Sequence, residues 1–227
     1  MAAGQKVAIA TLARHEAEDA WQGVAWGAER VIVSAAGLIF VDDQVEARTT
    51  GVSEMTMTAW PVVERPLAAG GARVEQTTDH GRTVLRISAP AKSVDVQVEP
   101  IDAGKYQLTL PRDALDGLSD LWLQVDYEAD SGMAFMHGRL VADNFHGGTP
   151  WLIGLKRFAP GILESGLCLV FHPLRQGAVK NVSSLLAGRT EFDGQEKLAV
   201  HSISVIPEYR ARLGYDDRPE GRPLAVT

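Results

Sequence analysis

The stretch LWLQVDY, residues 121–127, places Leu121, Leu123, Val125 and Tyr127 at every second position. Successive side chains of a β-strand point to opposite faces, so this spacing predicts a strand with one buried and one solvated face. The same period of two recurs in four other stretches: EMTMTAW (54–60), SVDVQVEP (93–100), YQLTL (106–110) and HSISVIP (201–207). Strands are therefore the dominant predicted element of this chain.

Turn signals rich in glycine and proline separate these strands, at Gly70-Gly71, Pro90 and Gly147-Gly148 among other positions. Two short segments look helical, HEAEDAW (15–21) and PRDALDGL (111–118). Strands do not alternate with long helices, which makes a parallel, doubly wound sheet a poor fit. Many short antiparallel strands predict an all-β fold, either a sandwich or a jelly roll.

The size and charge of the chain narrow the classes of function. A chain of 227 residues forms one large domain or two small ones. A change in sequence character near residues 111–120 predicts an N-terminal β-sandwich (1–115), a second domain (116–210) and an extended C-terminal tail (211–227).

The formal charge of −7 disfavours a nucleic-acid partner. No apolar run approaches the ~20 residues that span a bilayer. The start does not read as a secretory signal, so we expect a cytoplasmic protein.

Familiar catalytic patterns do not occur in the sequence, which has no GxSxG, HExxH, P-loop or GxGxxG motif. The single cysteine, Cys168, reads as a small buried hydrophobe in a strand. Acidic pairs such as Asp42-Asp43 lie in turn-like contexts, where solvated carboxylates are usual. We therefore assign no catalytic residue, no cofactor and no metal ligand, and whether the chain is an enzyme stays open.

One segment leaves a cation site open. Between Arg112 and Arg139 there is no lysine or arginine, whereas six acidic residues occur: Asp113, Asp116, Asp120, Asp126, Glu128 and Asp130. Ca²⁺ prefers several such oxygen ligands in one loop. A solvated acidic face is the alternative that we favour.

The stretch FMHGRLVADNFHGGTPWLIGLKRF, residues 135–158, reads as a hairpin with a tight His137-Gly138 turn, followed by a glycine loop. Sugar sites combine an aromatic ring with polar side chains that bind hydroxyl groups. Asp143, Asn144, His146 and Trp151 supply those groups and form the candidate carbohydrate site. The alternative is that Trp151 belongs to the core.

This stretch, together with LWLQVDYEADSGMA (121–134) before it, resembles the C-terminal β-sandwich of bacterial β-galactosidases of the glycoside hydrolase family 35 type. The similarity is most specific at residues 139–158, in LVADNF and PWLIGLKRF, and extends loosely over residues 7–210. The family's two catalytic glutamates lie on a barrel, and nothing in this chain aligns with them. The resemblance implies that Asp143 and Asn144 fix a turn and that Trp151 fills a seam.

From the strand pattern and the resemblance we expect two packed antiparallel β-sandwiches, the second a jelly roll like galactose-binding domains. The implied function is a non-catalytic β-sandwich part or small subunit of a β-galactosidase-like glycoside hydrolase. Its partner would be a catalytic barrel, whose sugar cleft it helps to shape. The alternative is a free-standing carbohydrate-binding module.

Overall fold

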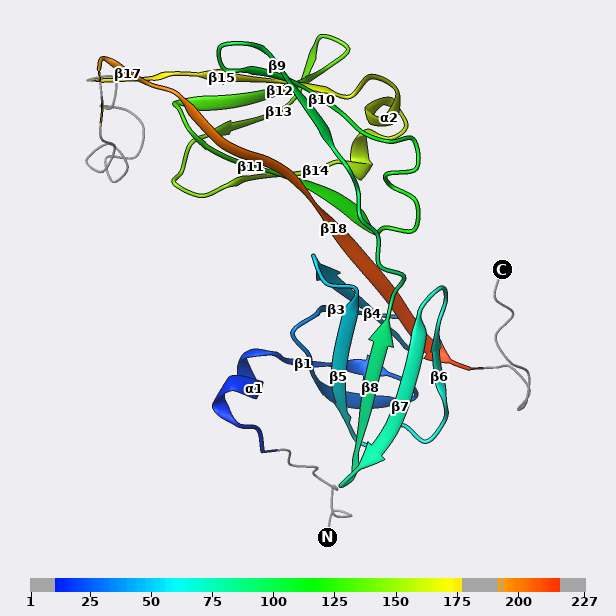
Figure 1. The fold of residues 1–227 in the computed structure, drawn as a ribbon. Coiled ribbons are helices and arrows are strands. Elements are labelled where there is room, and N and C mark those ends of the chain that lie inside the picture. Colours follow the sequence, from blue (N-terminus) through cyan, green and yellow to red (C-terminus); the bar gives the residue numbers. More distant parts are fainter. Residues whose placement is uncertain (1–10, 177–191, 193, 217–227) are drawn as a thin grey trace. The chain divides into compact units, whose positions relative to one another are not determined.

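The computed structural model describes residues 11–176, 192 and 194–216, and nearly all of its regular structure is β-strand. Two compact units make up the chain (Figure 1). Unit 1 contains residues 1–91 and 209–227, and unit 2 contains residues 92–208. The expectation of an all-β protein built from antiparallel sheets is confirmed.

Unit 1 begins with a short helix, α1 (Arg14–Glu18), at the position predicted for it. Its strands are β1 (Ala20–Ala25), β2 (Ala28–Val33), β3 (Gly37–Val41), β4 (Gln44–Thr50), β5 (Glu54–Trp60), β6 (Leu67–Ala69), β7 (Arg73–Asp79) and β8 (Arg82–Ser88). One layer, which we call sheet 1, has the order β1-β2-β5-β8-β7. The other layer, part of sheet 2, contains β3, β4 and β6 with the end of strand β18.

The two layers of unit 1 face each other across an apolar core. A Cβ atom added at Gly23 of sheet 1 would lie 2.5 Å from the ring of Phe40 in sheet 2. The indole of Trp26 is buried and donates a hydrogen bond to the Leu213 carbonyl oxygen at 3.1 Å. The alternation in EMTMTAW is confirmed, because Met55, Met57 and Ala59 of β5 are buried. Unit 1 is therefore a β-sandwich.

Strand β18 (Ala199–Tyr215) is 17 residues long and contributes to both units. Its residues 199–208 pair with β11 in unit 2, and Leu213, Gly214 and Tyr215 pair with β6 in unit 1. Residues 211–215 of the predicted tail therefore continue a strand. The rest of that tail, residues 217–227, lies outside the described residues.

Unit 2 contains the strands β9 (Gln97–Asp102), β10 (Lys105–Thr109), β11 (Asp120–Glu128), β12 (Ser131–Met136), β13 (Arg139–Phe145), β14 (Trp151–Gly154), β15 (Leu167–His172), β16 (Leu174–Arg175) and β17 (Glu196–Lys197). A 3-10 turn, η1 (Lys156–Phe158), and a short helix, α2 (Gly161–Ser165), connect β14 to β15. Sheet 3 has the order β13-β12-β15-β10-β9, and β14, β11 and the start of β18 form the facing part of sheet 2.

The pairing in unit 2 is nested in the manner of a jelly roll. The inner hairpin pairs β12 with β13, the next pair is β11 with β14, and the next is β10 with β15. Successive pairs alternate between the two sheets, so the chain wraps around one core. The outermost pair differs, because β9 pairs with β10 whereas β18 pairs with β11. Rings from both sheets meet in the core, where the centroids of Tyr127 and Phe171 are 4.9 Å apart.

Three expectations from the sequence differ from the structure. The segment PRDALDGL forms successive turns, closed by bonds such as the one from the Ala114 amide to the Pro111 carbonyl at 3.0 Å, and not a helix. The strand expected over 93–100 begins only at Gln97. The two compact units divide at residues 91/92 and 208/209, whereas the predicted domains divided at 115/116. Long-range pairing by β18 has no local sequence signal, which is why the unit bounds could not be read from composition.

Candidate functional site

Trp151, the aromatic residue of the predicted sugar site, opens β14 and is buried, with 7 % of its surface exposed. Its ring lies over Gly132 of β12, where an added Cβ would come within 3.0 Å of the indole. Its centroid is 6.5 Å from that of Tyr127, in an edge-on arrangement. A sugar ring stacks on an exposed aromatic face, whereas this indole packs inside unit 2.

Asn144 points to the inner side of β13, where its side-chain amide donates a hydrogen bond to the Tyr127 hydroxyl at 2.8 Å. That hydroxyl in turn donates to the Asn144 backbone carbonyl at 3.3 Å. The His146 ring packs against the same ring in a tilted arrangement, with 5.1 Å between centroids, and its backbone amide donates to the Asp130 carbonyl at 3.0 Å. Three of the four predicted site residues therefore surround Tyr127.

The Tyr127 hydroxyl is set into this packed cluster, and 1 % of the residue's surface is exposed. Burial raises the pKa of Tyr127, and the hydrogen bonds from the Asn144 amide and the Gly132 backbone amide partly offset that rise. The His146 Nδ1 atom is buried without a hydrogen-bond partner in the described part of the chain. The cluster thus holds β11, β13 and β14 together, and its polar atoms face inward.

Asp143, the fourth predicted residue, lies on the opposite face of β13 and is exposed. Its neighbour across the strand pair is Met133 of β12, which also faces outward. The four residues therefore do not form one continuous surface.

The outer face of sheet 3 is unusually apolar for a solvated surface. It displays six apolar side chains on three neighbouring strands, and we call this set the unit-2 apolar face: Met133, Phe135, Leu140, Phe145, Cys168 and Val170. Phe145 is 64 % exposed and Leu140 is 52 % exposed, while the other four are half-buried. Cys168 was expected to be buried and instead lies half-buried on this face.

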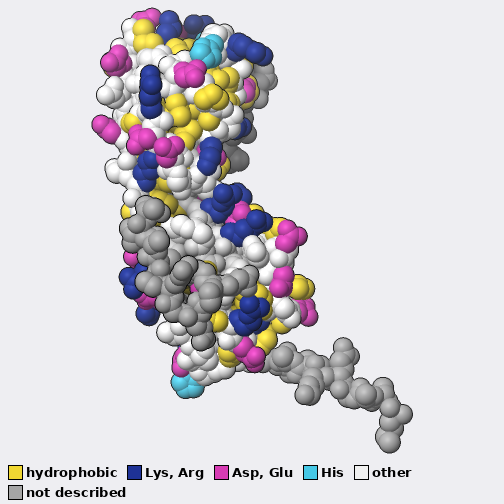
Figure 2. All heavy atoms as spheres, turned by 90° about the vertical axis from the view of Figure 1, so that its right-hand side faces the viewer, with side chains coloured by type: hydrophobic (Ala, Val, Ile, Leu, Met, Phe, Trp, Pro, Cys, Tyr) yellow, Lys and Arg dark blue, Asp and Glu magenta, His cyan; other side chains and the backbone are white. Residues whose placement is uncertain are grey.

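Polar groups border the unit-2 apolar face on several sides. Asp143 lies between Leu140 and Phe145 on the edge strand β13. His172 follows Val170 at the end of β15, and Lys105 of β10 pairs with Val170. An apolar centre with a polar rim is typical of protein–protein interfaces. Charged side chains of both signs are interspersed on the face of the molecule drawn in Figure 2.

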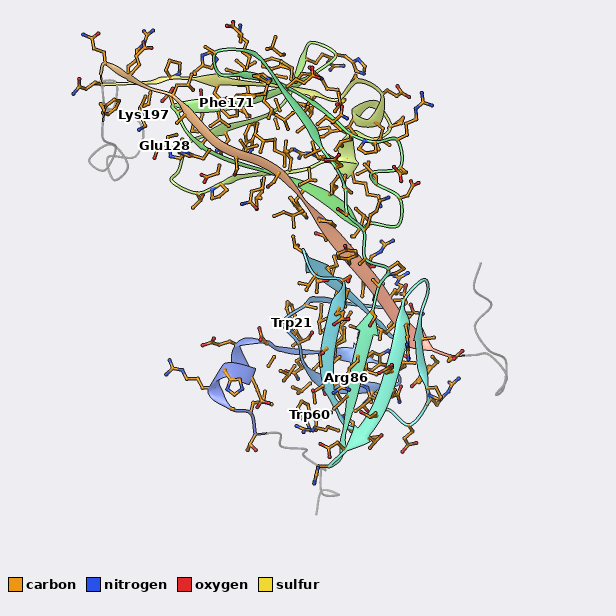
Figure 3. All side chains as sticks on the ribbon, in the orientation of Figure 1. Trp21, Trp60, Arg86, Glu128, Phe171 and Lys197 are labelled. Carbon is orange, nitrogen blue, oxygen red and sulfur yellow. The ribbon has the colours of Figure 1, made fainter. Side chains whose placement is uncertain are left out.

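A separate polar group marks one end of unit 2. Glu128 Oε2 accepts an ion pair from Lys197 Nζ at 3.1 Å, and its Oε1 lies 3.9 Å from His201 Nε2. Figure 3 shows Glu128, Lys197 and Phe171 in this part of unit 2. The side chains of Glu128, Lys197 and His201 are partly exposed, so this is a solvated surface network that contributes little to stability.

Two histidines, His137 and His146, lie at opposite ends of β13. His137 forms the turn before β13 and His146 follows its last residue, so the seven-residue strand separates them. Within the described residues, no group of three or more His, Cys, Asp or Glu side chains is placed to hold a metal ion. The acidic stretch between Arg112 and Arg139 lies within these described residues.

The residues that sequence reasoning missed are Tyr127, as the centre of the cluster, and the outward side chains of β12 and β15. A signal for the latter was present in LCLVFH, residues 167–172, where five consecutive apolar residues leave neither face polar. Such a run indicates a strand that is covered on both sides. Alternation alone directed attention to strands with one wet face.

Comparison of this chain with protein-family models, with curated proteins and with solved structures found no match. Among the helices described, none has the length and apolar character needed to cross a membrane.

Proposed function

We propose that this chain is a non-catalytic β-sandwich part or small subunit of a β-galactosidase-like glycoside hydrolase, and that it docks on a catalytic barrel through the unit-2 apolar face. The observation that carries the proposal is the group of apolar side chains at outward positions of β12, β13 and β15, on strands whose inward positions already form the core. Antiparallel sheets at a protein surface usually keep one face polar. A face with Phe145 and Leu140 more than half exposed is therefore expected to be covered by a partner.

The resemblance suggests the kind of partner. Its most specific part, residues 139–158, forms β13, β14 and the turn η1. Strand β13 is the edge of sheet 3 and carries Leu140, Asp143 and Phe145 of the proposed interface and its rim. The same segment supplies Asn144 and Trp151 to the interior. This arrangement supports a scaffold role for Asn144 and Trp151, but Asp143 and Asn144 lie within strand β13 and do not form the turn that the resemblance implied.

The test is co-expression with a barrel-only β-galactosidase-like protein encoded beside this chain, followed by size-exclusion chromatography with light scattering. We expect a stable complex, and we expect Phe145→Asp to weaken it at least about tenfold, because a buried unpaired carboxylate is costly at an interface. Val24→Asp is the matched control, since Val24 is 63 % exposed and lies in unit 1. Failure of the complex to form, or equal weakening by both variants, would contradict the proposal.

A further inference from the structure

Unit 1 carries a groove that is separate from the unit-2 apolar face. It is open to solvent and has a volume of about 790 Å³, within the range of small-molecule sites. Three segments line it: residues 33–37 after β2, residues 48–52 at the end of β4, and residues 54–58 of β5. All of these described lining residues belong to unit 1.

Hydroxyl groups dominate the polar lining of this groove. The hydroxyls of Ser34 and Thr49 are engaged, donating to the carbonyls of Thr56 at 2.9 Å and Val52 at 2.6 Å. The hydroxyls of Thr50, Thr56 and Thr58 make no hydrogen bond to other described residues. They are therefore available to a ligand that can both donate and accept hydrogen bonds.

The charges around the groove balance. The Arg48 guanidinium is bound by Glu46, with Nε 2.8 Å from Oε1. Glu54 lies two residues before Thr56 on β5, and Arg86 lies opposite Thr56 on β8. Both are exposed and form no ion pair with other described residues. One free anion beside one free cation gives no net field for a phosphate or a carboxylate. A neutral ligand with many hydroxyl groups suits this balance better.

An aromatic ring extends the site along β5. Trp60, Thr58, Thr56 and Glu54 occupy alternate positions, so all four side chains point to the outer face of sheet 1. Trp60 is half-buried beside Val31 of β2. Trp60 and Arg86, both labelled in Figure 3, belong to neighbouring strands of sheet 1. The six-residue distance from Glu54 to Trp60 spans ~20 Å of extended strand. That length suits a chain of several sugar units rather than a single sugar.

We propose that this face of unit 1 binds a neutral oligosaccharide, with Trp60 as the stacking platform and Thr56, Thr58 and Glu54 as hydrogen-bonding groups along the groove. The proposal stands apart from the docking function of unit 2, because it uses different residues on a different unit. It also differs from the site predicted around Trp151, whose ring is buried.

The experiment is calorimetric titration of the full chain with galactotetraose, xylotetraose and cellotetraose, and with a galacturonate tetramer as the acidic probe. We expect at least one neutral tetramer to bind, its monosaccharide to bind more weakly, and the acidic probe to bind no better. Trp60→Ala and Thr58→Val should each weaken binding about tenfold, by removing a stacking surface or one hydroxyl.

Thr77→Val is the matched control, because Thr77 is exposed on the same face of sheet 1 but on β7, away from the groove. It should leave the affinity unchanged, and urea unfolding of each variant checks that the fold is intact. Absence of heat with all three neutral tetramers would overturn the proposal. So would stronger binding of the acidic probe, or an equal loss of affinity in Thr58→Val and Thr77→Val.

Discussion

Replacing Tyr127 by phenylalanine tests whether the DNF segment acts as scaffold. The change keeps the ring and removes the hydroxyl that binds Asn144 Nδ2 at 2.8 Å and the Asn144 carbonyl at 3.3 Å. Because Tyr127 is 1 % exposed, water cannot replace the lost hydroxyl without a rearrangement. A buried polar group left without its partner costs about 1–3 kcal/mol, so we expect unit 2 to lose about 2 kcal/mol of stability.

The assay is native-state hydrogen exchange of the β11 and β13 amides, which reports on unit 2 without assuming that both units unfold together. A loss of about 2 kcal/mol lowers protection roughly 30-fold. Tyr106→Phe is the control, since Tyr106 is half-buried against Phe171 and its hydroxyl bonds to no other described residue. It should change protection by less than about 0.5 kcal/mol. Equal effects of the two changes would refute the reasoning.

The raised pKa of Tyr127 also predicts how the effect of Tyr127→Phe on stability changes with pH. The pKa of Tyr127 is raised by burial in the folded state, so the folded chain binds this proton more tightly than the unfolded chain. Stability from this group is complete below the unfolded pKa of about 10 and is lost as the pH rises through and above that value. The Tyr127→Phe variant has no hydroxyl to ionise at this position, so it does not lose this stability at high pH. We therefore expect the stability difference between the two proteins to narrow above about pH 10 in urea unfolding.

Two further substitutions test packing elsewhere. Gly166→Ala should destabilise unit 2 by more than about 3 kcal/mol in urea unfolding. The reason is that Gly166 has φ +66° and an added Cβ would lie 2.0 Å from the Leu108 carbonyl oxygen. Gly194→Ala is the control, because an added Cβ at Gly194 would meet no atom within 4 Å. Arg30→Met should destabilise unit 1 by about 3 kcal/mol, measured by exchange of the β2 amides. The buried guanidinium donates to the carbonyls of Ala25 and Trp26 at 2.9 Å each, and its loss leaves both without that partner. Unchanged protection in Arg30→Met would contradict that account.

The strands could be predicted from the sequence because their signal is local. Burial alternates along LWLQVDY as the spacing predicted, with Leu121, Leu123, Val125 and Tyr127 all buried. The His137-Gly138 turn was also predicted from neighbouring residues alone. The structure confirms it, because both residues have the positive φ, of 50° and 73°, that a tight two-residue hairpin turn requires. These features depend only on neighbours within a few positions.

The division into units and the fate of the predicted sugar site depended on contacts distant in sequence. Trp26 meets Leu213 across 187 positions, and Trp122 meets Glu208 across 86, with the indole donating to Oε2 at 2.9 Å. Spacing within LVADNFHGGTPW could show that Asn144 and Trp151 are near each other. It could not show that Tyr127, 17 positions before Asn144, occupies the space between the sheets and draws them inward.

The contrast between the two outer faces is what separates the two proposals physically. On sheet 3 the outward positions of β12 and β15 include Met133, Phe135, Cys168 and Val170, with Ser131 and His172 paired at one end. The four apolar side chains offer area but few hydrogen bonds and so suit a protein partner. On sheet 1 the outward positions of β5 are Glu54, Thr56, Thr58 and Trp60, which offer hydroxyls, a carboxylate and one ring. A hydrated oligosaccharide must exchange water for such groups, since an apolar surface cannot replace its hydrogen bonds. The two proposals therefore predict different kinds of partner for the two surfaces, and a substitution on one surface should leave binding at the other unchanged.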